Sequence, residues 1–414
     1  MEKIAVVGAG ITGLFTAYYL SASGFDVEVF DKGDIASGTS GKFHGMLHSG
    51  ARYAVTDKVS ASECISENNT ISSFARWFIN DTGGYFVSSN REESDYGDTL
   101  TKACNDAGIP NYDIDVDEFK KIEPNVKNVD RVIHVPDKVI RAYEFSAAVA
   151  AEAFMNGTKF RLYSPVASVS EKGGKYVLGI ERNGSLHYEH FDLIVNATGP
   201  FSGEFLKLAG YGGSPVMPSA GIMVVFSKPI VRSIINRMRE PSDADIMVPY
   251  DGLSILGTSA VIVDDPENFS IDSEDVEAMI EDMSSLIPLI RNVNYSRTYY
   301  SVRPLLEDEG DDARKASRSF RIIKNGEGVF TVVGGKFTTG RLIGEHVAKE
   351  ISKETGATIR IENPDLNSTY ERFIEKYGRD DKYIAKAMSR IGTIDEENAM
   401  RSVAYAISTI IEGS

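Results

Sequence analysis

Residues 3–31 read KIAVVGAGITGLFTAYYLSASGFDVEVFD. The apolar, β-branched run at 3–7 predicts a buried strand, and the spacing of apolar residues from Leu14 to Ser23 predicts a helix. Residues 25–30 predict a second strand, which ends at Asp31. The turn GAGITG joins the first strand to the helix. This succession of strand, glycine turn, helix and strand is typical of a dinucleotide-binding unit.

Each glycine of the turn has a separate physical task. Gly8 allows the tight turn, Gly10 allows the backbone to approach a pyrophosphate, and Gly13 allows the helix to pack on the strand. The helix N-terminus supplies amides and a partial positive charge to the anion. Asp31 lies 18 residues after Gly13, close to the spacing of about 20 expected for a carboxylate that binds a ribose hydroxyl.

Two later segments favour FAD over NAD. The run Asn196-Ala197-Thr198-Gly199 ends a predicted buried strand and would return the chain to the nucleotide. The turn Gly334-Gly335 precedes a predicted helix and offers amides to a second site, which would hold an anionic group or a ring carbonyl. One dinucleotide contacted by three distant segments would be an extended FAD.

Composition excludes several classes of protein. The chain has 414 residues, enough for two or three domains, and 44 basic against 60 acidic residues give a net charge of −16. This charge disfavours a nucleic-acid binder. Cys64 and Cys104, the only cysteines, cannot build a disulfide framework, a zinc site or an iron–sulfur cluster, and no metal is expected. A predicted strand directly after Met1 leaves no room for a signal peptide, so a cytoplasmic location is expected.

The remaining chain alternates between strand and helix patterns. Residues 33–50 are rich in glycine and serine and predict a loop that contacts a ligand, while 83–136 change in character and predict an inserted second domain. Strands are expected at 159–170, 175–181, 192–197, 222–226, 254–257, 299–302 and 329–333, with a hairpin turn at Gly173-Gly174. Helices are expected at 62–80, 143–156, 273–287 and 341–355, and a charge-dense loop at 307–318.

The predicted fold class is α/β. A discontinuous Rossmann-like FAD-binding domain would comprise residues 1–80, 140–215 and 320–360. An α+β substrate domain with an antiparallel or mixed sheet would comprise 81–139 and 216–319, and 361–414 would form a helical C-terminal segment.

Residues 39–57, TSGKFHGMLHSGARYAVTD, carry a specific resemblance. This stretch resembles the FAD-dependent glycerol-3-phosphate dehydrogenases, most closely the catalytic subunit of the anaerobic type, within the D-amino-acid-oxidase-like flavoprotein family. The runs SVRPL at 301–305 and GGKFTT at 334–339 are similar to later motifs of that family, and the resemblance covers about residues 1–355.

The resemblance implies non-covalent FAD and oxidation of glycerol 3-phosphate to dihydroxyacetone phosphate, with electrons passed to a quinone or a partner protein. Peripheral association with the inner face of the cell membrane would be compatible with this, since no apolar run approaches the roughly 18 residues of a membrane span. The residues expected to bind FAD are Gly8, Gly10, Ile11, Thr12, Gly13, Asp31, Lys32, Thr39, Ser40, His44, Gly45, Val166, Ala197, Thr198, Gly199, Gly335, Phe337, Thr338 and Thr339.

Four residues are expected to act on the substrate. By the same resemblance, Arg52 and Arg303 would contact it, and Lys336 would lie near the flavin or the substrate. Arginine provides the bidentate, charged donors that a phosphate dianion requires. His48 is the expected proton acceptor or orienting group. His134, His187 and His190 are expected to be structural or exposed.

Departures from the family pattern leave other functions open. Aerobic relatives have a histidine in the strand that here reads SAGIM at 219–223, and no cysteine follows Cys104 to bind a cluster, so the base and the electron acceptor stay open. One alternative is an oxidoreductase for a 2-hydroxy acid, such as L-2-hydroxyglutarate, or for an amino acid. Another is a component of a membrane-attached complex. Its docking stripe would comprise Met400, Val403, Ala404, Ile407, Ile410 and Ile411, although packing of this stripe on its own domain is favoured.

Overall fold

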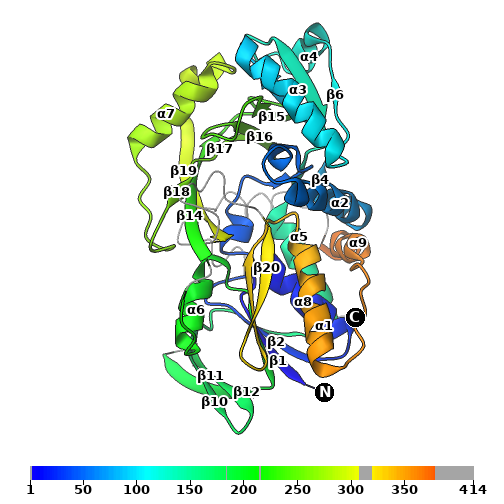
Figure 1. Cartoon of the computed structure of the whole chain (residues 1–414), viewed down its shortest axis with the longest axis vertical. Helices are drawn as coiled ribbons and strands as arrows, with labels where there is room; N and C mark the ends of the chain where they lie inside the picture. Colours follow the sequence, from blue (N-terminus) through cyan, green and yellow to red (C-terminus); the bar gives the residue numbers. More distant parts are fainter. Residues whose placement is uncertain (1, 183, 214–215, 307–318, 378–414) are drawn as a thin grey trace.

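The computed structural model of the chain describes residues 2–182, 184–213, 216–306 and 319–377, with side chains up to 371. Two large sheets lie at opposite ends of the long axis (Figure 1). The first contains the N-terminal strand and the second lies beneath helices α3, α4 and α7. The predicted loop at 307–318 and the apolar stripe at 400–411 lie outside the described residues.

The first sheet has six strands in the order β20-β21-β13-β1-β2-β9. All neighbours are parallel except the pair β20 and β21. The strands are β1 (Lys3–Val7), β2 (Asp26–Phe30), β9 (Lys159–Arg161), β13 (Leu193–Asn196), β20 (Phe320–Asn325) and β21 (Val329–Gly334). The chain therefore returns to this sheet from three distant parts of the sequence.

Strand order reverses at β1. Its neighbour on one side, β2, follows it directly through helix α1 (Ile11–Ala22), whereas its neighbour on the other side, β13, lies far along the chain at Leu193–Asn196. In an open parallel sheet the connections diverge at such a point and leave a crevice at the carboxyl ends of the strands. The glycine turn after Val7 lies in this crevice.

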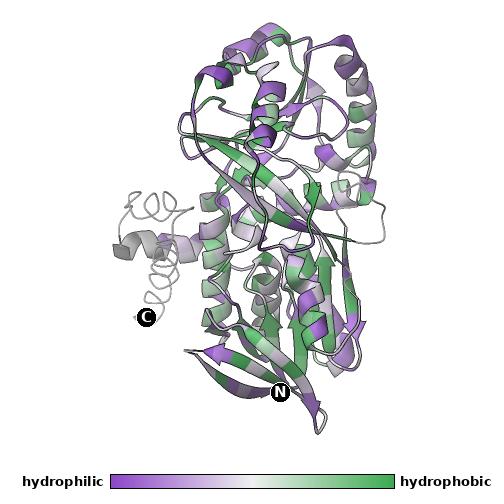
Figure 2. Ribbon diagram, turned by 90° about the vertical axis from the view of Figure 1, so that its left-hand side faces the viewer, coloured by the Kyte–Doolittle hydropathy of each residue, from purple (hydrophilic) through white to green (hydrophobic). Residues whose placement is uncertain are grey.

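Both faces of the six-stranded sheet are covered, which accounts for the nearly continuous apolar sequence of its strands. Helices α1, α5 (Ala142–Met155) and α8 (Gly340–Thr355) pack on one face. The other face is covered by α6 (Ser202–Leu208) and a meander of β10 (Val166–Lys172), β11 (Lys175–Arg182) and β12 (Ser185–Phe191). Hydrophobic residues lie along the central strands, and the outer helices are largely hydrophilic (Figure 2).

The second sheet is mixed and almost entirely antiparallel. Its order is β18-β14-β17-β16-β15-β5-β7-β6, and β19 also pairs with β14. The strands are β5 (Gly84–Ser88), β6 (Tyr112–Asp113), β7 (Arg131–Val135), β14 (Val216–Phe226), β15 (Ile234–Arg237), β16 (Ile246–Tyr250), β17 (Leu253–Gly257), β18 (Val261–Ile262) and β19 (Tyr295–Leu306). Helices α3 (Arg91–Asp106), α4 (Val116–Ile122) and α7 (Ser273–Ser284) belong to this end of the molecule (Figure 1).

A small third sheet joins the two ends. Its order is β3-β8-β4, from β3 (Met46–Leu47), β8 (Lys138–Ile140) and β4 (Ile79–Asn80). Residues 48–57 connect β3 to helix α2 (Lys58–Phe74). Helix α9 (Leu366–Tyr377) packs on α5. Short 3₁₀ turns occur at η1 (Thr39–Gly41), η2 (Ala51–Tyr53), η3 (Arg76–Phe78), η4 (Gly199–Phe201) and η5 (Pro288–Asn292).

These sheets confirm the predicted α/β fold class with a discontinuous dinucleotide-binding unit. The Gly173-Gly174 hairpin is also confirmed, since Lys172 pairs with Lys175 and both glycines have positive φ. The exact division into residues 1–80, 140–215 and 320–360 against 81–139 and 216–319 stays a prediction, as does the extent of the C-terminal segment. No described helix is long and apolar enough to cross a membrane.

Three local predictions were wrong. The helix expected at 62–80 is α2, which begins at Lys58 because the Asp57 carboxylate caps it at the Ser60 amide, 3.0 Å away. The strand expected at 159–170 is two strands, β9 and β10, in different sheets. The strand expected at 299–302 is longer: β19 begins at Tyr295 and continues through Pro304 to Leu306, because it is an edge strand, where a proline is tolerated.

Candidate active site

Two adjoining cavities form one cleft between the sheets. The turn cavity lies beside the glycine turn and is lined by residues that include Gly8, Asp31 and Gly199. The sheet cavity lies against the nine-stranded sheet and is lined by residues that include His48 and Lys336. Ile11, Thr12, Thr39 and Ser40 line both cavities. The shared wall is the N-terminus of α1 together with the η1 turn, so the two cavities meet at a helix N-terminus.

The glycine turn is built as its sequence predicts. Gly8 has φ +112°, and a Cβ there would lie 2.4 Å from the Ala197 carbonyl oxygen. A Cβ at Gly13 would lie 1.9 Å from the Gly8 carbonyl oxygen, so α1 packs directly on the turn. The Ser40 hydroxyl accepts a hydrogen bond from the Ile11 amide at 3.0 Å. Neither glycine can be replaced without moving backbone.

Asp31 organises the same turn from the end of β2. Its carboxylate accepts hydrogen bonds from the amides of Ala9 at 2.7 Å and Gly33 at 2.8 Å. Burial raises the pKa of Asp31, and these amides oppose that effect. Asp31 still lines the turn cavity, and its contact with a ribose stays a prediction. Lys32 beside it pairs with Glu267 across the cavity.

Most of the predicted cofactor residues line the cleft. In the turn cavity these are Gly8, Gly10, Ile11, Thr12, Asp31, Lys32, Thr39, Ser40, Val166, Ala197, Thr198 and Gly199. The sheet cavity adds His44, Gly335 and Phe337. Four others, Gly13, Gly45, Thr338 and Thr339, line neither cavity. Gly45 has φ +81°, and its missing side chain makes room for the Tyr250 ring, which a Cβ would approach to 2.4 Å.

Thr338 and Thr339 support the cleft from behind. The Thr338 hydroxyl is buried and accepts a hydrogen bond from the His48 amide at 3.1 Å. The Thr339 hydroxyl accepts one from the Lys336 amide at 3.1 Å. The run after β21 therefore holds the backbone of two predicted substrate residues, and a direct role of these threonines toward FAD stays a prediction.

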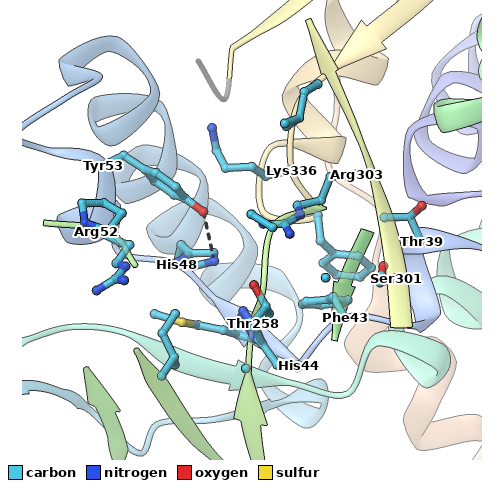
Figure 3. Close-up of a pocket in the computed structure, with 18 of the residues that line it drawn as sticks. Thr39, Phe43, His44, His48, Arg52, Tyr53, Thr258, Ser301, Arg303 and Lys336 are labelled. Carbon is cyan, nitrogen blue, oxygen red and sulfur yellow. Dashed lines mark hydrogen bonds between the residues drawn. The ribbon is translucent and has the colours of Figure 1, made fainter. Parts of the chain in front are cut away.

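Arg303 reaches the sheet cavity from β19 (Figure 3). Its guanidinium donates to the Ser259 carbonyl oxygen and, at 3.3 and 3.4 Å, to the carbonyl oxygens of Ala220 and Ser219. A Cβ at Gly221 would lie 2.7 Å from the Arg303 Nη2 atom, so that glycine leaves the room that the guanidinium occupies. These backbone carbonyl oxygens orient the guanidinium on the cavity wall.

Lys336 approaches the same cavity from the turn after β21. Its Nζ atom lies 5.1 Å from the centroid of the Tyr53 ring, within range of a cation–π contact. The Tyr53 hydroxyl lies 3.4 Å from His48 Nε2 (Figure 3). Lys336, Tyr53 and His48 thus form one group on the cavity wall.

Arg52 lines the cavity but is already paired with a carboxylate. Its Nη2 atom forms an ion pair with Asp245, whose side chain is 1% exposed. Asp245 also accepts from Arg239 Nε at 2.7 Å and from the Ser242 amide at 2.5 Å. That Arg52 contacts the substrate stays a prediction. The charge of the Arg52 guanidinium is largely compensated by the Asp245 carboxylate, which lies 193 residues away in the sequence.

His44 and His48 are both buried, and their rings meet edge to face with centroids 5.8 Å apart. Burial, together with the charges of Arg303 and Arg52, lowers the pKa of His44 to about 4. His44 is therefore neutral near pH 7. Its Nδ1 atom accepts from the Met46 amide at 3.3 Å, which assigns the proton to Nε2 and makes that atom a hydrogen-bond donor.

The remaining predicted histidines lie away from the cleft. His134 on β7 stacks on Tyr112, and its pKa is lowered by burial. His187 and His190 are exposed on β12. These positions agree with the expectation that the three histidines are structural or exposed. Among the residues that the structure describes, no group of three or more His, Cys, Asp or Glu side chains is arranged to hold a metal ion.

Several residues of the sheet cavity had no signal in the sequence. The loop between β15 and β16 contributes Asp243 and Asp245, and the turn after β17 contributes Thr258. Met223 on β14 completes the wall. Tyr53 lies inside the motif at 39–57, so its place in that motif was a signal for it.

The cleft fits an extended dinucleotide. Its two cavities are continuous through the α1 N-terminus, where the amides and the helix dipole favour a pyrophosphate. A side chain at Gly8 would collide with Ala197 backbone, and one at Gly10 would approach Ser40 Oγ to 3.1 Å. The turn cavity would hold the adenosine half of FAD, and the part of the sheet cavity near Phe337 and Gly335 would hold the flavin half.

Comparison with known proteins agrees with this geometry. The family described as FAD dependent oxidoreductase matches residues 3–350. A relative from Haloferax volcanii, named as one subunit of an anaerobic glycerol-3-phosphate dehydrogenase, is 34% identical over 376 residues, covering 86% of this chain and 64% of the relative. The corresponding protein of Escherichia coli K12, named in the same way, is 31% identical over 378 residues, covering 88% and 69%. The chain thus spans about two-thirds of the length of these curated relatives.

Solved structures share the fold. Glycine oxidase from Geobacillus kaustophilus superposes with a TM-score of 0.72 at 18% identity, covering 86% of this chain and 96% of the other. An L-alpha-glycerophosphate oxidase from Mycoplasma pneumoniae with FAD bound gives 0.72 at 17% identity, covering 88% and 98%. At such identities the likeness establishes the fold and not the substrate.

Proposed function

The chain belongs to the FAD-dependent oxidoreductase family, and we propose that it oxidises glycerol 3-phosphate to dihydroxyacetone phosphate. The identity of 31–34% to relatives named as glycerol-3-phosphate dehydrogenases supports this substrate. So does the chemistry of the sheet cavity.

One observation carries the proposal. Arg303, Lys336 and Arg52 come from three distant segments and line one cavity that continues into the dinucleotide cleft. Burying a phosphate dianion is costly unless charged donors surround it. The carbonyl-oriented guanidinium of Arg303 and the ammonium of Lys336 supply such donors. We therefore assign the phosphate to Arg303 and Lys336.

The reaction also needs a proton acceptor. FAD, when bound, accepts a hydride from the carbinol carbon. His48, whose Nε2 atom lies 3.4 Å from the Tyr53 hydroxyl, is assigned to receive the hydroxyl proton. The segment SAGIM at 219–223 contains no titratable side chain, so this part of β14 offers no alternative base. His44, a neutral donor, is assigned to a hydrogen bond with an oxygen of the substrate or of the flavin ring.

Electron transfer beyond FAD is proposed to involve a partner. Relatives from two organisms are named as single subunits of an anaerobic dehydrogenase, which supports a partner subunit. An acceptor protein or a quinone as the next electron carrier stays a prediction. A cytoplasmic location and peripheral association with the inner face of the membrane remain predictions.

Anaerobic titration of the FAD-loaded protein tests the substrate. Bleaching of the flavin absorbance by glycerol 3-phosphate, with weaker or no bleaching by 2-hydroxyglutarate, glycine or proline, is the expected result. The two enantiomers of the phosphate are titrated separately. Bleaching by a carboxylate substrate and not by either phosphate would replace the proposal with the 2-hydroxy acid or amino acid alternative.

A further inference from the structure

The segment that carries His48 and Arg52 is attached to the rest of the protein by side chains outside the cleft. Asn68 on α2 donates to the Leu47 carbonyl oxygen at 3.0 Å, and Thr338 accepts from the His48 amide. Gly50, with φ +96°, lies so close to α2 that a Cβ would approach the Ala61 carbonyl oxygen to 2.3 Å. Each attachment limits where the two side chains of the segment can lie.

A further attachment is a buried carboxylate. Asp137, in the turn between β7 and β8, accepts a hydrogen bond from the Ser49 amide at 2.6 Å. Asp137 is only 1% exposed. Gly84 leaves space for its carboxylate, because a Cβ at Gly84 would lie 2.7 Å from the Asp137 Oδ2 atom. Asp137 lines neither cavity. Burying a carboxylate costs free energy, so packing alone does not account for Asp137 at the Ser49 amide.

We propose that Asp137 is a positioning residue that holds the Ser49 amide and thereby fixes the His48 and Arg52 side chains on either side of it. This inference rests on the proposed function for its kinetic consequence, but the hydrogen bond itself does not. A carboxylate accepts such a bond about twice as strongly as a neutral group does. The attachment is therefore strongest when Asp137 is ionised.

The surroundings of Asp137 make this charge state sensitive to pH. Burial raises its pKa to about 6, against the opposing effects of the Ser49 hydrogen bond, the nearby Asn236 amide and the Arg52 charge. Among the described residues, Cys64 on α2 and Cys104 on α3 also interact electrostatically with Asp137. Burial raises the pKa of both thiols to about 12, so they stay neutral. Below about pH 6 the attachment should weaken, and above it the segment should be held firmly.

Hydrogen exchange measured by mass spectrometry tests the attachment without substrate. In the wild-type holoenzyme, protection of the peptide that contains Ser49 should rise about fivefold between pH 5 and pH 7, after correction for intrinsic exchange. Asp137→Asn should remove this step. Glu123→Gln is the matched control, because Glu123 is also buried and accepts the Ser233 amide at 2.6 Å but lies outside both cavities. A flat profile in the wild type would overturn the proposal even if the variant fails to fold.

Kinetics provides the second readout. Asp137→Asn should lower kcat for glycerol 3-phosphate about fivefold or more at pH 7.5 with normal FAD content, and its loss relative to wild type should shrink toward pH 5. The substrate phosphate titrates near pH 6 in every variant, so the difference between variants is the informative quantity. Equal kcat values in Asp137→Asn and wild type, or an equal loss in Glu123→Gln, would refute positioning. Absence of turnover in wild type would instead refute the proposed function.

Discussion

Removing the Arg303 side chain is the most direct perturbation of the proposed phosphate site. The guanidinium is held by three backbone carbonyl oxygens on β14 and the turn after β17, and it lines the sheet cavity. Arg303→Ala deletes the charge and leaves the turn cavity, where the adenosine half of FAD would lie, intact, because Arg303 does not line that cavity. FAD content should therefore stay normal.

The expected loss follows from the bonds that would be made to the substrate. A hydrogen bond to a charged group contributes about 1.5–3 kcal/mol, which corresponds to a loss in kcat/KM of at least about tenfold for one such bond. Arg303→Lys should recover little of it, because an ammonium cannot reproduce the forked geometry. Gly221→Ala should mimic part of the effect, since its Cβ would lie 2.7 Å from the Arg303 Nη2 atom and displace the guanidinium.

Steady-state rates with glycerol 3-phosphate and an artificial dye acceptor provide the assay. Arg297→Ala is the control, because Arg297 lies on the same strand but lines neither cavity. Unchanged kcat/KM in Arg303→Ala would remove Arg303 from the site and transfer the phosphate to Lys336 and Arg52. A loss shared equally by Arg297→Ala would mean that β19 itself had been disturbed.

Three further predictions concern the cofactor and stability. Gly8→Ala should yield protein without FAD, measured by absorbance after purification, because its Cβ would meet the Ala197 carbonyl oxygen at 2.4 Å in a left-handed backbone conformation; retention of FAD would contradict this. Asp245→Asn should lower the free energy of unfolding in urea by about 3–5 kcal/mol, because it leaves the largely buried Arg52 side chain without its carboxylate, and a loss below about 1 kcal/mol would mean that the pair is dispensable. Glu144 is buried, neither of its carboxylate oxygens has a hydrogen-bond partner in another described residue, and burial raises its pKa from 4.5 to about 7. Because the carboxyl pKa is raised in the folded protein, the wild type loses stability as pH rises from 4.5 through 7. Glu144→Gln should therefore be more stable than wild type at pH 8 but not at pH 4.5. The same difference in urea midpoint between variant and wild type at both pH values would refute this.

The dinucleotide-binding unit was predictable because its determinants are local. The glycine turn, the strand before it and Asp31 after the second strand all lie within residues 3–31, and each meets a backbone requirement that few residue types satisfy. The hairpin at Gly173-Gly174 was predictable for the same reason, since both glycines adopt positive φ. Helix bounds were less accurate where a cap, such as Asp57 for α2, lies before the periodic residues.

The candidate site was predictable only as a set of residues. The motif at 39–57 singled out His48 and Arg52, and later runs singled out Arg303 and Lys336, all of which line one cavity. The sequence did not reveal how they divide the work. Nothing in the spacing indicated that β19 would continue through Pro304 as an edge strand and present Arg303 beside the carbonyls of β14.

Only the tertiary structure decided the partners of the charged groups. Asp245 lies 193 residues from Arg52 and Asp137 lies 88 from Ser49, and no periodicity or motif connects such positions. Their pairing depends on which strands become neighbours in the nine-stranded sheet and on the empty volume left by Gly84 beside Asp137. Short stretches of sequence determine local backbone conformation. Burial, charge compensation and pKa values depend on contacts that exist only after distant strands have packed together.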